Sequence, residues 1–274
     1  MSTTTVPEGA ANPAGATPAV APAAPPAERG GRRPGRRIVD APTRMAHALI
    51  ALSFFGAYLS AEGERWRALH VTLGYVLAGA LAFRVLYGLF GPRQARVALW
   101  FRKLAAAPQW LRAAAASLRQ GRPGAVPWRQ GQNLLMAAVV AALPLGLLPL
   151  LASGLAPHLE WATGGVADAL SELHEALGEG LLLLVLAHVG LVAGLSLLRR
   201  QNQARPMLDG RVPGTGPDLA RRNHGGLAAL LLAAALGFVA WQWQGTPGGL
   251  VPDAALSAGA GHADRGHAAT EDDD

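Results

Sequence analysis

One apolar stretch of the sequence reads Leu173-His174-Glu175-Ala-Leu-Gly-Glu179-Gly-Leu-Leu-Leu-Leu-Val-Leu-Ala-His188. It continues to Leu198, which makes it long enough to span a membrane as a helix. A helix advances about 1.5 Å and 100° per residue, so the two histidines lie about 21 Å apart and about 40° around the axis. Ionisable residues inside a span are usually functional, and neutral imidazole is a common ligand of haem iron. We therefore expect this helix to hold two stacked haems.

The composition indicates a multi-span membrane protein. Among 274 residues, 51% are hydrophobic and only 15% are charged, and several long runs carry no charge. The net charge of +6 does not indicate nucleic-acid binding, because the arginines lie beside apolar runs and no nucleic-acid-binding module accompanies them. We therefore predict an all-α fold, an integral membrane helical bundle with a four-helix haem-binding core and a fifth C-terminal transmembrane helix.

Cysteine is absent from the sequence. Its absence excludes disulfides, Cys-ligated iron–sulfur clusters, Cys-ligated zinc sites and the covalent attachment of c-type haem. Any haem must therefore be held non-covalently by His or Met.

The apolar runs divide the chain into segments. Residues 1–37 are rich in Ala and Pro and predict a disordered cytoplasmic tail. A membrane domain over residues 38–210 contains spans at about 43–60, 69–90, 133–155 and 173–198, and we expect Pro144 and Pro149 to kink or break the third. The basic segment 92–129 predicts an interfacial helix. A linker at 211–224, a fifth span at 225–244 and a flexible acidic tail at 245–274 complete the chain.

Basic residues set the expected orientation, because short loops rich in Lys and Arg stay in the cytoplasm. Residues 29–44 hold six, residues 93–129 hold eight and residues 199–222 hold six, whereas the alternate side receives only Arg65, Arg67 and Arg265. We therefore predict a multi-pass protein of the bacterial inner membrane, anchored by an uncleaved first span. Its N-terminus is expected in the cytoplasm and its C-terminus in the periplasm.

Four histidines fall within or at the ends of the predicted spans, and their depths match in pairs. His70 and His174 lie near the outer side, whereas His47 and His188 lie toward the cytoplasm. We therefore predict two haem irons, one ligated by His70 and His174 and one by His47 and His188. Iron with two axial histidines has no open position, which favours electron transfer over substrate oxidation at the metal. His158, His224, His262 and His267 are interpreted as solvated residues.

Spacing alone leaves other interpretations open. A histidine near a span end often serves as an interfacial hydrogen-bonding residue, and the same four could form a proton relay or bind zinc in a haem-free transporter or scaffold. Arg84 either pairs with a haem propionate or quinone-site group, or extends to the cytoplasmic interface. Glu175 and Glu179 either exchange protons with a quinol or are solvated. Gly74 and Gly178 would give a porphyrin room, although small residues also serve helix packing.

Several motifs then carry a resemblance. The chain resembles the bacterial cytochrome b561 and nickel–iron hydrogenase b-type cytochrome family over roughly residues 37–210. The motifs are Asp40-Ala-Pro-Thr-Arg44-Met-Ala-His47, Leu69-His70-Val-Thr-Leu-Gly74-Tyr75, Phe83-Arg84-Val-Leu-Tyr87-Gly88 with the residues following to Arg96, Glu172-Leu-His174-Glu175, and Ala187-His188-Val189. Val39 and Ala48 stand where aromatic residues are frequent in the family, which affects packing around the inner haem more than its ligation.

The resemblance implies that His47, His70, His174 and His188 ligate two haems b. It also implies a respiratory-chain electron carrier that acts between quinone or quinol and a redox partner such as a soluble cytochrome or a hydrogenase subunit. Whether the chain is itself a quinone oxidoreductase or the cytochrome b subunit of a larger complex stays open, as does a homodimer. Membrane lipid is the remaining expected partner, and nucleic acid is not expected.

Overall fold

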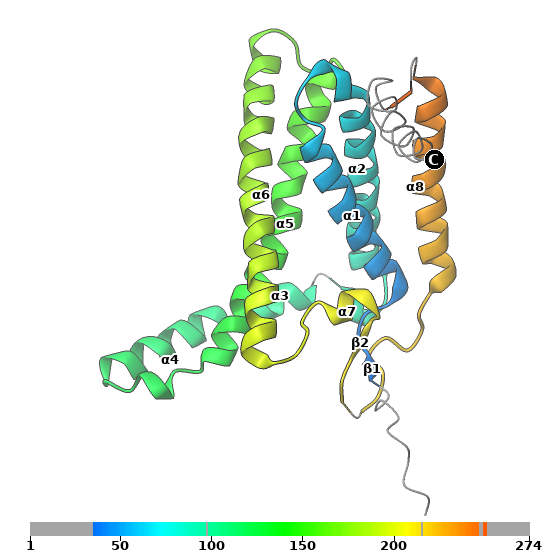
Figure 1. Ribbon diagram of the computed structural model, residues 1–274. Coiled ribbons are helices and arrows are strands. Elements are labelled where there is room, and N and C mark those ends of the chain that lie inside the picture. The colour runs from blue at the N-terminus through cyan, green and yellow to red at the C-terminus, as the bar shows by residue number, and fades with distance from the viewer. Residues whose placement is uncertain (1–34, 97, 215, 247–248, 251–274) are drawn as a thin grey trace, which may run out of the picture. The chain divides into compact units, whose positions relative to one another are not determined.

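The computed structural model describes residues 35–96, 98–214, 216–246 and 249–250. Its long helices are α1 (Ala41–Leu59), α2 (Arg67–Phe90), α5 (Trp128–His158), α6 (Gly165–Arg199) and α8 (Gly225–Gly245) (Figure 1). The shorter elements are β1 (Arg36–Arg37), η1 (Glu64–Trp66), η2 (Arg93–Ala95), α3 (Ala98–Leu104), α4 (Ala107–Arg119), η3 (Pro123–Ala125), α7 (Arg205–Leu208) and β2 (Arg211–Val212). The described residues are thus almost entirely helical or in loops, as an all-α fold requires.

Within the described residues, four helical segments are long and apolar enough to cross a membrane. They are Glu64–Phe90, Trp128–His158, Gly165–Arg199 and Gly225–Gly245. Large apolar side chains on these helices are exposed, among them Phe90 (82%) and Leu197 (80%), so a lipid environment rather than water suits them. Helix α1 is not among the four, although the sequence predicts a span there. A helical membrane bundle is therefore confirmed, with α1 as an additional long helix.

The bundle is built from two helical hairpins. Helix α1 packs against α2, and α5 packs against α6, whereas few contacts join one hairpin to the other. Glycines permit the close approach within each hairpin. A Cβ atom on Gly56 would lie 2.7 Å from Leu73 Cδ1, and one on Gly146 would lie 2.9 Å from Leu181 Cδ2. Helix α8 packs on α1 and α2. The space between the hairpins is therefore where other groups can be held.

An apolar layer joins the two hairpins at mid-height. Its buried members come from four helices and are Phe54, Leu77, Leu81, Leu147, Leu150 and Leu181. Leu181 lies seven residues from both His174 and His188 along α6. The layer therefore separates the level of one histidine from the level of the other.

The start of α1 is set by Asp40. Its carboxylate accepts a hydrogen bond from the Thr43 backbone N–H at 3.2 Å, which caps the helix, and Pro42 occupies the first turn, where no backbone donor is required. The same carboxylate accepts a hydrogen bond from the Tyr87 hydroxyl of α2 at 2.8 Å. Asp40 is only 1% exposed, so this cap is also a buried link between the first two helices.

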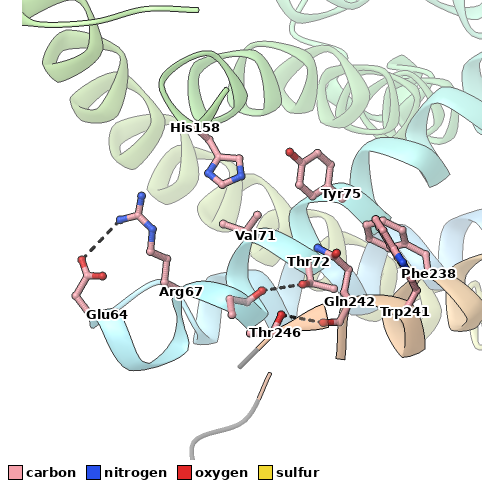
Figure 2. Close-up of a pocket in the computed structure, with 11 residues that line it drawn as sticks. Glu64, Arg67, Val71, Thr72, Tyr75, His158, Phe238, Trp241, Gln242 and Thr246 are labelled. Carbon is pink, nitrogen blue, oxygen red and sulfur yellow. Dashed lines mark hydrogen bonds and ion pairs between the residues drawn. The ribbon is translucent and has the colours of Figure 1, made fainter. Parts of the chain in front are cut away.

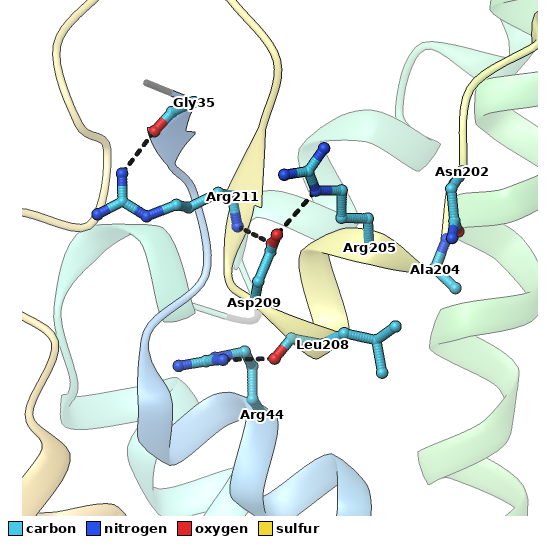
Figure 3. Close-up of polar contacts among 8 residues, drawn as sticks. All are labelled: Gly35, Arg44, Asn202, Ala204, Arg205, Leu208, Asp209 and Arg211. Carbon is cyan, nitrogen blue, oxygen red and sulfur yellow. Dashed lines mark hydrogen bonds and ion pairs between the residues drawn. The ribbon is translucent and has the colours of Figure 1, made fainter. Parts of the chain in front are cut away.

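A segment after α6, residues 205–212, packs against the chain around the start of α1, and we call this set of contacts the clasp. Strands β1 and β2 pair antiparallel, Ile38 N–H donates to the Gly210 carbonyl at 2.8 Å, and the Arg44 guanidinium donates to the Leu208 carbonyl at 2.7 Å (Figure 3). The sequence predicted a disordered tail over residues 1–37 and a linker over residues 211–224. Residues 36–37 instead form a strand, because β2 supplies its pairing partner. The rest of that tail, and most of the predicted acidic tail, lie outside the described residues.

Three predicted segments differ in detail from the structure. Helix α5 runs unbroken through Pro144 and Pro149, since a membrane helix tolerates proline where neighbours pack on it. Helix α6 begins at Gly165, before the predicted start at residue 173, and its first two turns mix apolar residues with Asp168, Ser171 and Glu172, which interrupt the apolar run. The interfacial segment forms two short helices rather than one. Pro108, which has no N–H to donate, sits in the first turn of the second.

Candidate functional site

His70 on α2 and His174 on α6 lie in different hairpins, and we call this pair the outer site after the side of the membrane that the sequence predicts for it. Their ring centres are 6.1 Å apart and the ring planes meet at 78°. The two hairpins thus bring together two histidines that are far apart in sequence, in the pairing that the depths predict.

Each outer imidazole is oriented by a backbone carbonyl. His70 Nδ1 donates to the Ala57 carbonyl, and His174 Nδ1 donates to the Leu150 carbonyl, both at 2.8 Å. A carbonyl oxygen only accepts, so Nδ1 carries the hydrogen and Nε2 keeps its lone pair. A second hydrogen bond of this kind is how proteins fix the ring of a metal-ligating histidine. Both imidazoles are therefore prepared to donate electron pairs from Nε2.

A pocket of about 620 Å³ opens around these two rings. Small residues line it, including Gly74 of α2 and Gly154 of α5. A Cβ atom on Gly74 would meet no atom within 4 Å, whereas one on Gly154 would lie 2.6 Å from the His174 ring. Gly74 therefore leaves open space beside the histidines, and Gly154 lets the His174 ring lie against the α5 backbone.

The outer residues fit a haem. With about 2.0 Å between each nitrogen and the metal, two imidazoles that ligate one ion from opposite sides have their ring centres about 6 Å apart. The observed 6.1 Å agrees with that separation. In the part of the chain that the structure describes, no three His, Asp or Glu side chains group as a metal-ion site. Two facing histidines beside open space suit a porphyrin, which would bring four further nitrogens, better than they suit zinc.

The inner site contains His47 on α1 and His188 on α6. His47 lies close enough to both His188 and Arg84 to interact with them electrostatically. The His188 Nδ1 atom is buried and has no hydrogen-bond partner among the described residues. A buried polar atom without a partner is costly, so this ring suits a site that a bound group completes.

Charged residues accompany the inner site. The half-buried Arg84 guanidinium donates to the Ala95 carbonyl at 3.3 Å and interacts electrostatically with Asp40 and Tyr87. Because Ala95 follows the end of α2, the Arg84 side chain extends toward the helix end that carries the basic segments. Glu175 and Glu179, by contrast, are exposed on α6 at the outer end.

A second pocket, of about 730 Å³, lies beside the outer site (Figure 2). The Tyr75 ring lies 6.0 Å from the His158 ring and 6.1 Å from the Phe238 ring of α8, and Phe238 lies 5.9 Å from Trp241. Arg67 and Glu64 lie at the same pocket and form an ion pair of 3.6 Å. His158, interpreted from the sequence as a solvated residue, is exposed but lines both pockets.

One known protein family matches the membrane domain that carries these histidines. A family model described as prokaryotic cytochrome b561 matches residues 38–210, more than half of the chain. The chain belongs to the prokaryotic cytochrome b561 family. The resemblance seen in the sequence motifs is thereby confirmed. This cytochrome b561 is a multi-pass bacterial membrane protein, and its family implies b-type haem and electron transfer. No curated protein and no solved structure matches the chain.

Several features of this cytochrome b561 were not predicted from its sequence. The carbonyls of Ala57 and Leu150 orient the outer imidazoles, and a backbone acceptor leaves no mark in a sequence. Gly154 was also missed, although a glycine one residue after a serine in a membrane helix is a signal of close packing. The link from Asp40 to Tyr87 joins two of the quoted motifs, but only the structure shows that they touch. Helix α8 lies beyond the family match.

Proposed function

We propose that this protein is a di-haem cytochrome b of the respiratory chain that passes electrons between the quinone pool and a periplasmic or membrane redox partner. His70 and His174 would ligate an outer haem b, and His47 and His188 an inner one. The observation that carries the proposal is the pair of facing outer imidazoles, 6.1 Å apart, with both Nδ1 atoms engaged by backbone carbonyls.

The proposed topology has five spans, α1, α2, α5, α6 and α8. The 19 residues of α1 extend about 28 Å, close to the thickness of a bilayer's hydrocarbon core. Helices α3 and α7 and the β1–β2 pair, with their basic residues, gather at one end of the bundle in Figure 1. The positive-inside rule supports a cytoplasmic location for that end.

The chain's residues have separable tasks in this function. Haem would supply one-electron chemistry, and two histidine ligands would leave no position for oxygen or substrate. The carbonyls of Ala57 and Leu150 hold the outer imidazoles in the tautomer that donates from Nε2. The apolar layer around Leu77 and Leu181 keeps water from the space between the two levels. Arg84 places a positive charge at the inner level, where a propionate or an additional electron would be stabilised.

The second pocket is our proposed place for the quinol ring. Tyr75, Phe238 and Trp241 offer flat apolar surfaces, and the imidazole of His158 can accept a proton as the quinol is oxidised. The pocket shares Arg67 and His158 with the outer pocket, so the ring would lie beside the outer haem.

The haem-free transporter alternative receives less support. Such a protein needs a polar, water-accessible route with acids or broken helices at mid-membrane. Here the layer between the two histidine levels is made of Phe and Leu side chains, and α5 is continuous.

The decisive test is the haem content and redox behaviour of the full chain purified in detergent. We expect two haems b per chain and two separate steps in a potentiometric titration of the visible spectrum, with reduction on addition of a quinol. A helical, monodisperse preparation without haem would overturn the cytochrome assignment. A haem-loaded protein that quinol does not reduce would overturn the quinone assignment alone.

A further inference from the structure

The segment between α2 and α5 has no task in the electron transfer proposed above. It contains α3 and α4 and connects two helices that are long and apolar enough to cross a membrane. Both of its ends are therefore held at a membrane surface. Figure 1 shows α4 running away from the bundle, at the end where α7 and the β1–β2 pair lie.

The rotation of α4 about its axis is fixed by one packed face. Trp110 Nε1–H donates to the Pro127 carbonyl at 3.1 Å, and the Trp110 ring lies so close to Gly131 that a Cβ atom there would clash at 2.4 Å. Ala114, one turn further on, is 8% exposed. These contacts anchor α4 to the start of α5 and decide which of its other residues face outward.

An apolar stripe on α4 is left uncovered. Leu111 is 58% exposed and Leu118 is 53% exposed, and Ala115 lies between them on the same face, within about 40° of Leu111. In the preceding helix, Phe101 is 60% exposed. A helix that lies in a membrane surface turns such a stripe toward the acyl chains.

Two arginines flank the apolar stripe. Arg112 and Arg119 lie about 80–100° around the helix from Leu111, on the side away from the packed Trp110 face, and both are exposed. Residues 92–129 contain eight basic side chains and no Asp or Glu. A surface that combines an apolar stripe with uncompensated positive charge complements an anionic lipid headgroup above acyl chains.

We propose that α3 and α4 form a docking surface for anionic phospholipid at the end of the bundle that carries the basic segments. Leu111, Ala115 and Leu118 enter the acyl region, and Arg112 and Arg119 bind the phosphates. The strong positive charge disfavours a second copy of this chain, which would bring the same charge to the contact, and zwitterionic lipid offers no net charge to match.

The full chain permits a direct test, because it has no Cys and a single introduced one carries the only label. Ala115→Cys on the apolar stripe and Gln109→Cys, about 160° around α4 from Leu111, would each be labelled with an environment-sensitive fluorophore. Each protein is reconstituted in vesicles of phosphatidylcholine alone or with phosphatidylglycerol. We expect a larger blue shift at position 115 when phosphatidylglycerol is present, and little change at position 109.

Arginine variants identify the source of the lipid preference. Arg112→Gln/Arg119→Gln in the Ala115→Cys background is expected to lose the phosphatidylglycerol-dependent part of the shift. Arg221→Gln/Arg222→Gln, which removes two exposed arginines outside α4, is the matched control and is expected to keep it. High salt should also reverse the shift in the unaltered protein, a readout that needs no arginine variant.

Three outcomes would overturn the proposal. One is an equal shift in both lipids. Another is equal loss in both double variants, which would mean a general charge effect. The third is a shift that follows the protein-to-lipid ratio rather than the lipid charge, which would assign the stripe to a second copy of the chain.

Discussion

The outer and inner histidine pairs share helix α6 but differ in how the imidazoles are held. At the outer level, each Nδ1 donates to a backbone carbonyl, and the two rings already face each other at 6.1 Å. At the inner level, His188 Nδ1 is buried without a partner among the described residues, and the neighbouring groups are charged. The outer imidazoles are oriented by backbone carbonyls, whereas the described residues offer the buried His188 Nδ1 no hydrogen-bond partner and place charged groups near His47.

The location of each pair explains part of this difference. Ala57 lies in the last turn of α1, where its carbonyl accepts hydrogen bonds from Ser60 and from the His70 ring. The inner pair lies near the end where Asp40 caps α1 and Tyr87 reaches back to it. The outer level therefore uses backbone carbonyls of α1 and α5, and the inner level lies near polar and charged side chains.

The largest expected effect comes from removing a ligand. His70→Ala or His174→Ala should abolish the outer haem and about half of the haem absorbance, since a site that uses two histidine ligands binds haem weakly when one of them is removed. His188→Ala should remove the inner haem, and each variant serves as the control for the other. The pyridine haemochrome content and the remaining step of the redox titration measure the result. Loss of the same redox step from all three variants, with helicity retained, would contradict the pairing.

A smaller change at Gly154 tests whether the outer imidazole must lie against α5. Gly154→Ala places a Cβ atom 2.6 Å from the His174 ring, so the ring has to move and the outer haem should be lost or shifted in potential. Gly178→Ala is the control, because its Cβ would find its nearest neighbour at 4.0 Å. Spectra of the outer haem measure the change. An unaltered Gly154→Ala spectrum would show that His174 is held elsewhere.

Gly74 tests whether the open space is where the porphyrin lies. In the chain alone, a Cβ atom on Gly74 meets nothing within 4 Å, and the same is true of Gly79 on the same helix. Of these two glycines, Gly74 lines the outer pocket and Gly79 does not. Gly74→Ala should therefore weaken outer haem retention several-fold in a haem-transfer assay, whereas Gly79→Ala should not. Equal behaviour of the two variants would remove the porphyrin from this pocket.

The inner level is tested by Tyr87→Phe, which deletes the hydrogen bond to the buried Asp40 carboxylate. A hydrogen bond to a charged group contributes roughly 1.5–3 kcal/mol, so the free energy of unfolding in detergent should fall by about that amount. The inner haem potential should shift while the outer potential stays constant. Tyr58→Phe, at a residue 37% exposed on α1, is the control and should leave both unchanged. A shift confined to the outer potential would contradict the assignment of levels.

The smallest effect concerns pH and the clasp before α1. A hydrogen bond from Arg205, with another from the Arg211 backbone, holds the pKa of the exposed Asp209 carboxyl below its ordinary value of 3.8. A lowered pKa means that Asp209 stabilises the clasp above that value and that this contribution is lost as the pH falls through the lowered pKa. A spin label on Met207→Cys should therefore become more mobile as the pH falls through the lowered pKa of Asp209. The outer haem spectrum should stay unchanged.

The matched control for the clasp is Asp209→Asn. In the Met207→Cys background, this variant should leave the spin label mobile at every pH, because the amide side chain carries no charge that acidification could remove. A label whose mobility falls with acidification would contradict the expected sign.

The sequence predicted the elements more accurately than their contacts. Apolar runs located the long helices, because a bilayer demands about twenty apolar residues per helix and leaves that mark in a sequence. Matching depth placed His70 and His174 at one level, where the structure brings their rings together, since antiparallel helices of known direction fix which residues share a level. Their ligation of one haem stays a prediction. The first residues of α6, 165–172, and the strand at Arg36–Arg37 were missed because neither belongs to a long run of apolar side chains.

What the sequence by itself determined is therefore the membrane helices, the family motifs and the candidate ligands, because hydropathy and residue type are local properties. The tertiary structure alone decided that Ala57 and Leu150 carbonyls orient the outer imidazoles and that Gly154 lets His174 lie against α5. It also decided that Asp40 and Tyr87 join two motifs 47 residues apart. The physical reason is that the role of a backbone carbonyl or a glycine depends on its position among the packed helices. The residue type by itself does not specify that position.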